Sequence, residues 1–281
     1  MTYRIAVAGG GTMGAGIAYA AALVGGDVLV IEPDDARAEA LARTIREAAA
    51  AAVSRGKLDA TAASALAARI SRRATPDAIP LGLDLVIETV PERIALKLEA
   101  LARIAEREPA MIASNTSALS ISRLAGGVRD AGTFLGMHFF NPVWSFRLVE
   151  LVRGERTSKS TLERARHFVR WLGKESLTAR DVAGFATSRL DLIASLEAMR
   201  MLESGVASAE DIDRAAVLAY RHPVGPLRLS DIVGLDVRLD IARVLEAAHG
   251  SRFAPPQILE DLVAQGRLGV KSGRGFYEWR L

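Results

Sequence analysis

The sequence of 281 residues has no cysteine, 5% aromatic residues and a formal net charge of only +3. Without cysteine it has no disulfide, no thiolate metal site and no cysteine nucleophile. We therefore expect a reducing, cytoplasmic compartment and no metal centre. The charge is too small and too dispersed to indicate a nucleic-acid partner. No apolar run reaches the ~18 residues of a membrane span, so we expect no membrane contact.

The composition is that of an ordinary globular protein, half hydrophobic and one quarter charged. A chain of this length is expected to form about two domains. Its basic residues are uneven, because only five of the 36 are lysine. This excess of arginine has two interpretations. One is a bias in nucleotide composition, and the other is an anionic partner such as a phosphate, because arginine binds phosphate well.

The first third of the chain alternates strand and helix patterns. Arg4–Ala8 reads as a strand, Thr12–Leu23 as a helix rich in small residues, and Val28–Ile31 as a second strand. Further strands are predicted at Leu83–Thr89, Ala110–Ser114, Thr133–Phe139 and Leu148–Val152. This alternation predicts an α/β domain with a mostly parallel sheet that is covered by helices on both faces.

The remaining segments are predicted to be helical. Residues 34–70 read as a helical hairpin, capped by Asp34 or Asp35, and Pro91 suits the first turn of the helix that follows it. After about residue 181 the strand signal fades, and helices are predicted at 184–204, 209–218 and 235–248. We therefore expect a domain at 1–183 and an all-α domain at 184–281.

The segment GGGTMG at residues 9–14 matches G-x-G-x-x-G between a predicted strand and a predicted helix. Gly9 permits a tight turn, Gly11 lets the backbone approach a pyrophosphate, and Gly14 lets helix and strand pack closely. The helix N-terminus supplies free N–H groups for phosphates. The alternative is a plain glycine turn without a ligand. The residues expected to contact a dinucleotide here are Gly9, Gly11, Thr12, Met13 and Gly14.

Glu32 ends the second predicted strand, 18 residues beyond Gly14. A carboxylate at this position accepts hydrogen bonds from the ribose hydroxyls of adenosine and repels a 2′-phosphate. It therefore predicts NAD rather than NADP as the cofactor. Arg37 lies close by in the sequence and is the one feature that would suit a phosphate instead.

Polar residues gather where three predicted strands end. Ser117 follows the strand at 110–114, His138 ends the next strand, and Glu150 lies on the strand after that. Open α/β sheets bind ligands at the carboxyl ends of their strands. Oxidation of an alcohol needs a base near neutral pH, which His138 can supply, and a carboxylate on its other nitrogen would fix the tautomer. Taken alone, His138 would more commonly be a structural residue.

Seven stretches together resemble the short-chain 3-hydroxyacyl-CoA dehydrogenases. They are GGGTMGAGIA, LVIETVPERIALK, SNTSALSI, GMHFFNPV, LVELVRG, HPVGPLRLSDIVGLD and GRLGVKSGRGFYEW. The resemblance spans nearly the whole chain and implies a Rossmann-type N-terminal domain and a helical C-terminal domain that forms a homodimer. It also implies NAD-dependent oxidation of (S)-3-hydroxyacyl-CoA, of which 3-hydroxybutyryl-CoA is expected, in fatty acid metabolism.

The resemblance also implies roles for single residues. His138 corresponds to the catalytic base, Glu150 to its carboxylate partner, and Ser117 to the serine that bonds the substrate oxygen. Four further residues match positions that contact the cofactor or its surroundings, namely Glu92, Lys97, Asn115 and Asn141.

Three positions depart from the family pattern. Ser188 stands where relatives carry a catalytic asparagine, which predicts a weaker hold on the thioester carbonyl. Trp144 follows the HFFNPV motif, where it would narrow the acyl pocket, offer a stacking face or simply pack under a loop. Ala51 replaces one lysine expected to meet the CoA phosphates, while Arg55 and Lys57 remain.

These departures keep two alternatives open beside oxidation of 3-hydroxyacyl-CoA. The first is the same hydride chemistry on an acyl group bound to a carrier protein, or on a free hydroxy acid or sugar acid. The second, more remote, is an NAD-binding protein without catalysis, which only Ser188 supports.

Overall fold

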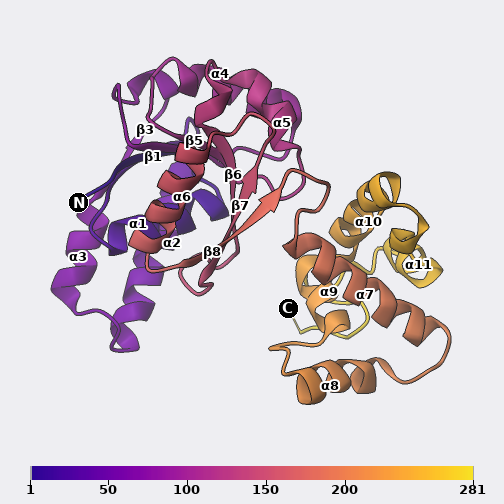
Figure 1. Ribbon diagram of the computed structural model, residues 1–281. Helices are drawn as coiled ribbons and strands as arrows, with labels where there is room; N and C mark the ends of the chain where they lie inside the picture. Colours follow the sequence, from indigo (N-terminus) through magenta and orange to yellow (C-terminus); the bar gives the residue numbers. More distant parts are fainter. Residues whose placement is uncertain (1, 281) are drawn as a thin grey trace. The chain divides into compact units, whose positions relative to one another are not determined.

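The computed structural model describes residues 2–280 and divides the chain into two compact units, Met1–Val182 and Ala183–Leu281. The described part of the first unit is built on an eight-stranded sheet in the order β3-β2-β1-β4-β5-β6-β7-β8 (Figure 1). Its strands are β1 (Arg4–Ala8), β2 (Asp27–Ile31), β3 (Ile70–Arg73), β4 (Leu85–Glu88), β5 (Ile112–Ser114), β6 (Phe134–Phe139), β7 (Leu148–Arg153) and β8 (Glu175–Arg180).

The first six strands of the sheet are parallel, and β7 and β8 run in the opposite direction as a parallel pair. The fold class is confirmed, because a mostly parallel sheet is followed by an all-helical unit. The order of the strands reverses between β1 and β4. Open α/β sheets bind ligands outside the carboxyl ends of the strands at such a switch point.

Helices cover both faces of the sheet, as right-handed crossovers require. In the first unit they are α1 (Thr12–Leu23), α2 (Asp35–Ser54), α3 (Ala60–Ala68), α4 (Ile94–Ala105), α5 (Ile121–Leu124) and α6 (Lys159–Trp171). Side chains of α1, α2, α3 and α6 pack with the strands in one hydrophobic cluster. α4 and α5 lie on the other side, at the top of Figure 1.

In the second unit, the regular elements among the described residues are helices. They are α7 (Thr187–Glu203), α8 (Ala209–Tyr220), α9 (Pro226–Val233), α10 (Leu235–His249) and α11 (Gln257–Ala264). Two isolated β-bridges lie in the segment after α11. Leucines and a methionine from four of these helices form its core, as with Leu196, Met199, Leu227, Leu239 and Leu259. The sequence predicted α7, α8 and α10 of this unit, while α9 and α11 were not predicted.

Two strands were missed by the sequence analysis. β3 and β8 are the edge strands, with the polar sequences ISRR and ESLTAR, and both pair with a buried inner strand. An edge strand takes its stability from that neighbour, and its own residues show no apolar run. Ile70, expected to end a helix, instead begins β3 opposite Val28.

Two helix starts were also placed too early. α4 begins at Ile94, so Pro91 lies before the helix, in a turn whose carbonyl accepts the Arg93 N–H at 2.7 Å. α7 begins at Thr187, because Gly184 and Phe185 have φ of 74° and 45° in the left-handed region. A helix cannot include such residues.

Candidate functional site

The glycine turn joins β1 to α1 at the switch point of the sheet. Gly9 has φ 119°, and a Cβ on it would lie 2.7 Å from the Thr89 hydroxyl. A Cβ on Gly14 would lie 1.9 Å from the carbonyl oxygen of Gly9. Gly11 meets nothing within 4 Å, so the backbone is open to solvent there. The turn is therefore closed on the protein side and accessible on the side where a pyrophosphate is expected.

A cleft of about 730 Å³ lies beside this turn. Its walls are the turn itself, the end of β2, the segment at 74–76, the loop at 89–93 and one face of α4. The free N–H groups at the start of α1 give this cleft a partial positive charge. The residues present therefore fit a dinucleotide, with its phosphates at the N-terminus of α1.

Glu32 is buried at the carboxyl end of β2 and lines the same cleft. One carboxylate oxygen accepts the Gly10 N–H at 2.9 Å and the other accepts the Asp34 N–H at 3.0 Å. Each oxygen has a second lone pair, so the carboxylate can accept ribose hydroxyls as well. The two backbone bonds fix its orientation before any ligand binds.

His138 and Glu150 are directly opposite each other on the antiparallel strands β6 and β7. The imidazole Nδ1 lies 3.0 Å from Glu150 Oε2, and the two residues are 8% and 0% exposed. The His138 ring also packs against Phe140, with ring centroids 4.5 Å apart. The structure thus brings together the two residues that the sequence suggested as base and partner, at the same sheet edge as the glycine turn.

The loop after β5 lies at this edge too. The Asn115 side-chain oxygen accepts the N–H of Phe139, the residue after His138, at 2.9 Å. Ser117 is exposed, and its N–H donates to Glu92 at 3.1 Å. Asn141 is exposed two residues beyond the end of β6. Asn115 therefore couples the serine loop to the strand of the histidine.

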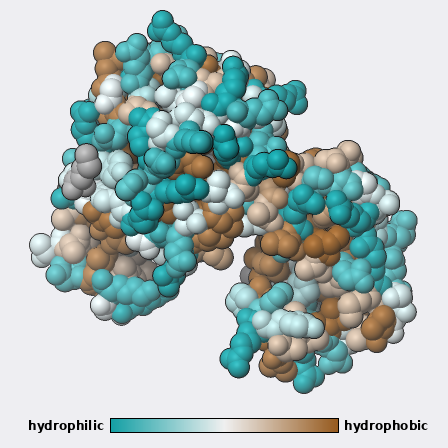
Figure 2. All heavy atoms as spheres, in the orientation of Figure 1, coloured by the Kyte–Doolittle hydropathy of each residue, from teal (hydrophilic) through white to brown (hydrophobic). Residues whose placement is uncertain are grey.

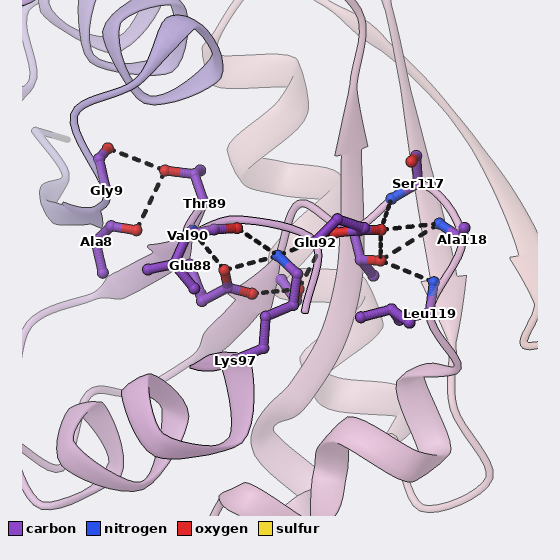
Figure 3. A network of polar contacts seen from close by, with 12 residues as sticks. Ala8, Gly9, Glu88, Thr89, Val90, Glu92, Lys97, Ser117, Ala118 and Leu119 are labelled. Atoms are coloured by element: carbon purple, nitrogen blue, oxygen red, sulfur yellow. Dashed lines mark hydrogen bonds and ion pairs between the residues drawn. The ribbon is translucent and has the colours of Figure 1, made fainter. Parts of the chain in front are cut away.

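Lys97, buried in α4, is bound by groups of the protein (Figure 3). Its Nζ lies 2.8 Å from Glu88, 3.0 Å from the carbonyl of Val90 and 3.2 Å from Glu92. Sequence analysis named Lys97 and Glu92 but missed Glu88, which reads as the end of an apolar strand. Its only signal was a carboxylate closing the run LVIE.

A second cavity, of about 430 Å³, lies between the α2–α3 hairpin and the loop after β6. It brings Trp144 together with Ala51, Arg55 and Lys57, all four of which the sequence singled out. The Trp144 ring meets the Tyr19 ring edge-on at 5.4 Å and remains 38% exposed. The indole therefore forms a wall of this cavity beside the two cations.

Ser188 belongs to the second unit, in the first turn of α7. Among residues 2–280 no group of three or more His, Asp or Glu side chains is arranged to hold a metal ion. Within the same range, no helix is both long and apolar enough to cross a membrane.

Both units match models of one protein family. Residues 4–182 match the NAD-binding domain of 3-hydroxyacyl-CoA dehydrogenase, and residues 184–279 match its C-terminal domain. A 3-hydroxybutyryl-CoA dehydrogenase of Mycobacterium tuberculosis is 39% identical over 98% of both chains. The crystal structure of (S)-3-hydroxybutyryl-CoA dehydrogenase from Ralstonia eutropha superimposes with a TM-score of 0.95, at 36% identity over 99% of both chains.

A relative that is named for a different substrate is nearly as similar. The 3-hydroxyadipyl-CoA dehydrogenase of Escherichia coli is 37% identical over 98% of this chain and 59% of its own length. Fold and glycine site together define an NAD-binding oxidoreductase of the two-domain dehydrogenase type. The chain belongs to the 3-hydroxyacyl-CoA dehydrogenase family. It is an NAD-dependent enzyme of fatty acid and related metabolism, with an acyl-CoA substrate.

Proposed function

We propose that this enzyme reversibly oxidises short (S)-3-hydroxyacyl-CoA, with 3-hydroxybutyryl-CoA as its main substrate, to the 3-ketoacyl-CoA. The observation that carries this proposal is the His138–Glu150 pair, with 3.0 Å between Nδ1 and Oε2, at the carboxyl edge of the sheet. The names of the M. tuberculosis and R. eutropha relatives, both 3-hydroxybutyryl-CoA dehydrogenases, support the four-carbon acyl group.

The chain's own residues divide the work as follows. Glu150 accepts Nδ1–H of His138, so Nε2 is the nitrogen that takes the hydroxyl proton. Glu150 also stabilises the imidazolium that forms. Ser117 donates a hydrogen bond to the substrate oxygen, and Ser188 contributes a weaker bond on the thioester side. NAD, when bound, supplies the acceptor for the hydride that leaves C3. In the reverse direction His138 returns the proton to the ketone oxygen.

The cofactor half of the proposal concerns single residues. The glycine turn, with Gly9, Gly11, Thr12, Met13 and Gly14, holds the pyrophosphate, and Glu32 binds the adenosine ribose. Glu92, Lys97, Asn115 and Asn141 surround the nicotinamide end. We place the CoA nucleotide near Arg55 and Lys57, with Trp144 at the edge of the substrate site. Domain 1–183 then holds the cofactor and the base. The expected cytoplasmic location stays a prediction.

A substrate panel tests this proposal. Purified enzyme is given NADH and, separately, acetoacetyl-CoA, longer 3-ketoacyl-CoA esters, the same acyl groups on a carrier protein, and free keto acids. We expect acetoacetyl-CoA to be reduced at about 1 to 10³ per second. A rate orders of magnitude lower, with faster turnover of a carrier-bound or free acid, would select the alternative that Ala51, Trp144 and Ser188 favour. NADH binding without any turnover would select the inactive protein.

We also propose that the helical unit forms a homodimer. Exposed apolar side chains on this unit support it, and brown surface is visible over it in Figure 2. Leu190, Leu218 and Tyr220 are 71%, 72% and 76% exposed. Sedimentation equilibrium should give twice the 30.0 kDa mass of one chain. A monomer at micromolar concentration would contradict this.

A further inference from the structure

Glu88, the last residue of β4, is a buried carboxylate that the proposed mechanism does not use. The residue has 0% exposure. Its Oε1 accepts the Val90 N–H at 2.6 Å and the ammonium of Lys97 at 2.8 Å. Its Oε2 accepts the Ser114 hydroxyl at 2.6 Å. One carboxylate thus joins the ends of two neighbouring strands, β4 and β5, and the start of the loop after each.

Two chains of contacts run from Glu88 to the loop that contains Ser117. In the first, the Ser114 hydroxyl bound to Glu88 accepts the Thr116 N–H at 3.3 Å. In the second, the Lys97 ammonium bound to Glu88 also lies 3.2 Å from Glu92 Oε2. The first chain therefore ends at Thr116, the residue before Ser117, and the second reaches Glu92.

Glu92 completes the second chain of contacts (Figure 3). Its Oε1 accepts the N–H groups of Ser117 at 3.1 Å and Ala118 at 3.2 Å, together with the Thr116 hydroxyl. Thr116 Oγ1 in turn accepts the Leu119 N–H at 2.9 Å. Side-chain oxygens that are linked to Glu88 therefore accept the backbone N–H groups of residues 116–119.

Burial of the Glu88 carboxylate removes it from water, which is costly. It raises the pKa of Glu88, although the contacts with Lys97, Ser114 and Val90 act to lower that pKa. Replacing a buried ion pair by apolar residues is commonly neutral or stabilising. A gain in stability therefore does not explain why a charged pair is buried here. A carboxylate differs from an apolar side chain here in one respect, which is that it accepts several bonds in fixed directions.

We propose that Glu88 is a positioning residue, which holds the backbone of residues 114–118 so that Ser117 presents its hydroxyl to the substrate oxygen. It acts through Ser114 on one side and through Lys97 and Glu92 on the other. This inference rests on the role proposed above for Ser117. It adds that the reaction depends on a side chain that does not touch the substrate.

A double-mutant cycle with Ser117 tests the inference. Glu88→Gln keeps the shape of the side chain and removes its charge, and Ser114→Ala cuts one chain of contacts while leaving Glu88 and Lys97 in place. Each is measured alone and combined with Ser117→Ala, as kcat at saturating NADH and acetoacetyl-CoA. We expect each to lower kcat by about tenfold in the parent enzyme, which is less than the roughly 10²-fold cost of a full 1 Å misplacement.

In the Ser117→Ala background the same changes should lower kcat by less than about twofold, because there is no hydroxyl left to position. Equal losses in both backgrounds would overturn the inference and leave Glu88 a structural residue. Glu163→Gln is the matched control, since Glu163 is exposed on α6. If Glu88→Gln does not fold, Ser114→Ala decides the result.

A second measurement is independent of any substrate. Amide hydrogen exchange of residues 116–119 should be faster in folded Glu88→Gln and Ser114→Ala than in the parent, with exchange in β1 unchanged. Unchanged exchange at Ser117 and Ala118 would overturn the inference even if activity fell. If the parent enzyme reduces no thioester, the proposed function fails, while the exchange data still show whether Glu88 holds the loop.

Discussion

Both units contain buried carboxylates, but the groups that these carboxylates contact differ between the units. In the first unit, Glu150 faces an imidazole and Glu88 faces an ammonium, at the edge of the sheet where ligands are expected. In the second unit, Asp231 and Asp213 are also buried, at 0% and 6% exposure, but their donors lie in the C-terminal segment and, for Asp213, also at the start of α9.

The hydrogen bonds of Asp231 and Asp213 anchor the C-terminal segment to the second unit. Asp231 accepts the N–H groups of Phe276 and Tyr277 and the indole N–H of Trp279, each near 2.9 Å. Asp213 accepts the N–H of Leu227 at the start of α9 and the Tyr277 hydroxyl. Two carboxylates thereby fix a segment that has no regular helix of its own.

The comparison teaches that burial alone does not identify a catalytic carboxylate. Asp231 is as buried as Glu150, yet the groups bound to it are amide and indole N–H groups that do not titrate near neutral pH. Glu150 is bound to an imidazole, a side chain of the kind that can act as a general base. The donor that a buried carboxylate contacts and its location in the fold distinguish a candidate for catalysis from a carboxylate that anchors the backbone. Four measurements can test that distinction.

The largest effect is expected at His138. His138→Gln removes the base, so kcat should fall by about 10⁴-fold, while the Kd of NADH stays within about twofold of the parent. Stopped-flow kinetics and NADH fluorescence measure the two quantities. The exposed His167→Gln on α6 is the control. Full activity of His138→Gln would remove the assignment of this pair as catalytic.

Glu150→Gln should have the second largest effect. The imidazole remains, but its tautomer and orientation are no longer fixed, so kcat should fall on the order of 10²-fold, less than for loss of the base itself. Steady-state kinetics give the value, and Glu155→Gln, at an exposed position, is the comparison. A loss of thermal stability with unchanged kcat would place Glu150 with the anchoring carboxylates of the second unit.

Asp231→Ala should change stability and leave cofactor binding alone. Three donors lose their acceptor, and the free energy of unfolding of the second unit should fall by at least about 2 kcal/mol. Calorimetry measures this, with Asp240→Ala, at an exposed position of α10, as control. The Kd of NADH should not change, because the cofactor cleft lies in the first unit. An unchanged unfolding transition would contradict the anchor.

The smallest change in stability is expected at Tyr277, where the free energy of unfolding should also depend on pH. Burial raises the pKa of its hydroxyl, and the hydrogen bond to Asp213 raises it further. The folded state therefore holds this proton more strongly than the unfolded chain. The resulting stability is complete below the unfolded pKa of about 10 and is lost as the pH rises above it.

Tyr277→Phe should accordingly unfold more easily by about 1 kcal/mol at neutral pH. It should also lose less stability than the parent between about pH 9 and 11. Urea unfolding at each pH measures both, with the exposed Tyr220→Phe as control. Parallel pH curves for parent and Tyr277→Phe would show that Asp213 does not hold this proton.

Much of the cofactor region could be predicted because its signals are local. The strand Arg4–Ala8, the glycine turn and the helix Thr12–Leu23 were predicted with the bounds that the structure has. Glycines at fixed spacing determine such a turn by steric limits within a few residues. The partnership of His138 and Glu150 was also suggested from two neighbouring strands, and the register now places them opposite each other.

Other features depend on neighbours that are distant in the sequence. The edge strands β3 and β8 are polar and were missed, since their pairing with β2 and β7 defines them. Glu88 is 26 residues from Ser114, and nothing in either segment indicates their hydrogen bond. Trp144 and Arg55 line one cavity although they are far apart in the sequence, and neither segment indicates that they meet.

The sequence by itself determined the strand, glycine turn and helix at residues 4–23, the acid at the end of β2 and the change from an α/β pattern to a helical one, because local sterics and apolar periodicity act over a few residues. Only the tertiary structure decided which donors the buried carboxylates Glu88, Asp213 and Asp231 accept. The physical reason is that a buried carboxylate takes its chemistry from the donors that the fold brings within hydrogen-bond distance, and those donors come from anywhere in the chain.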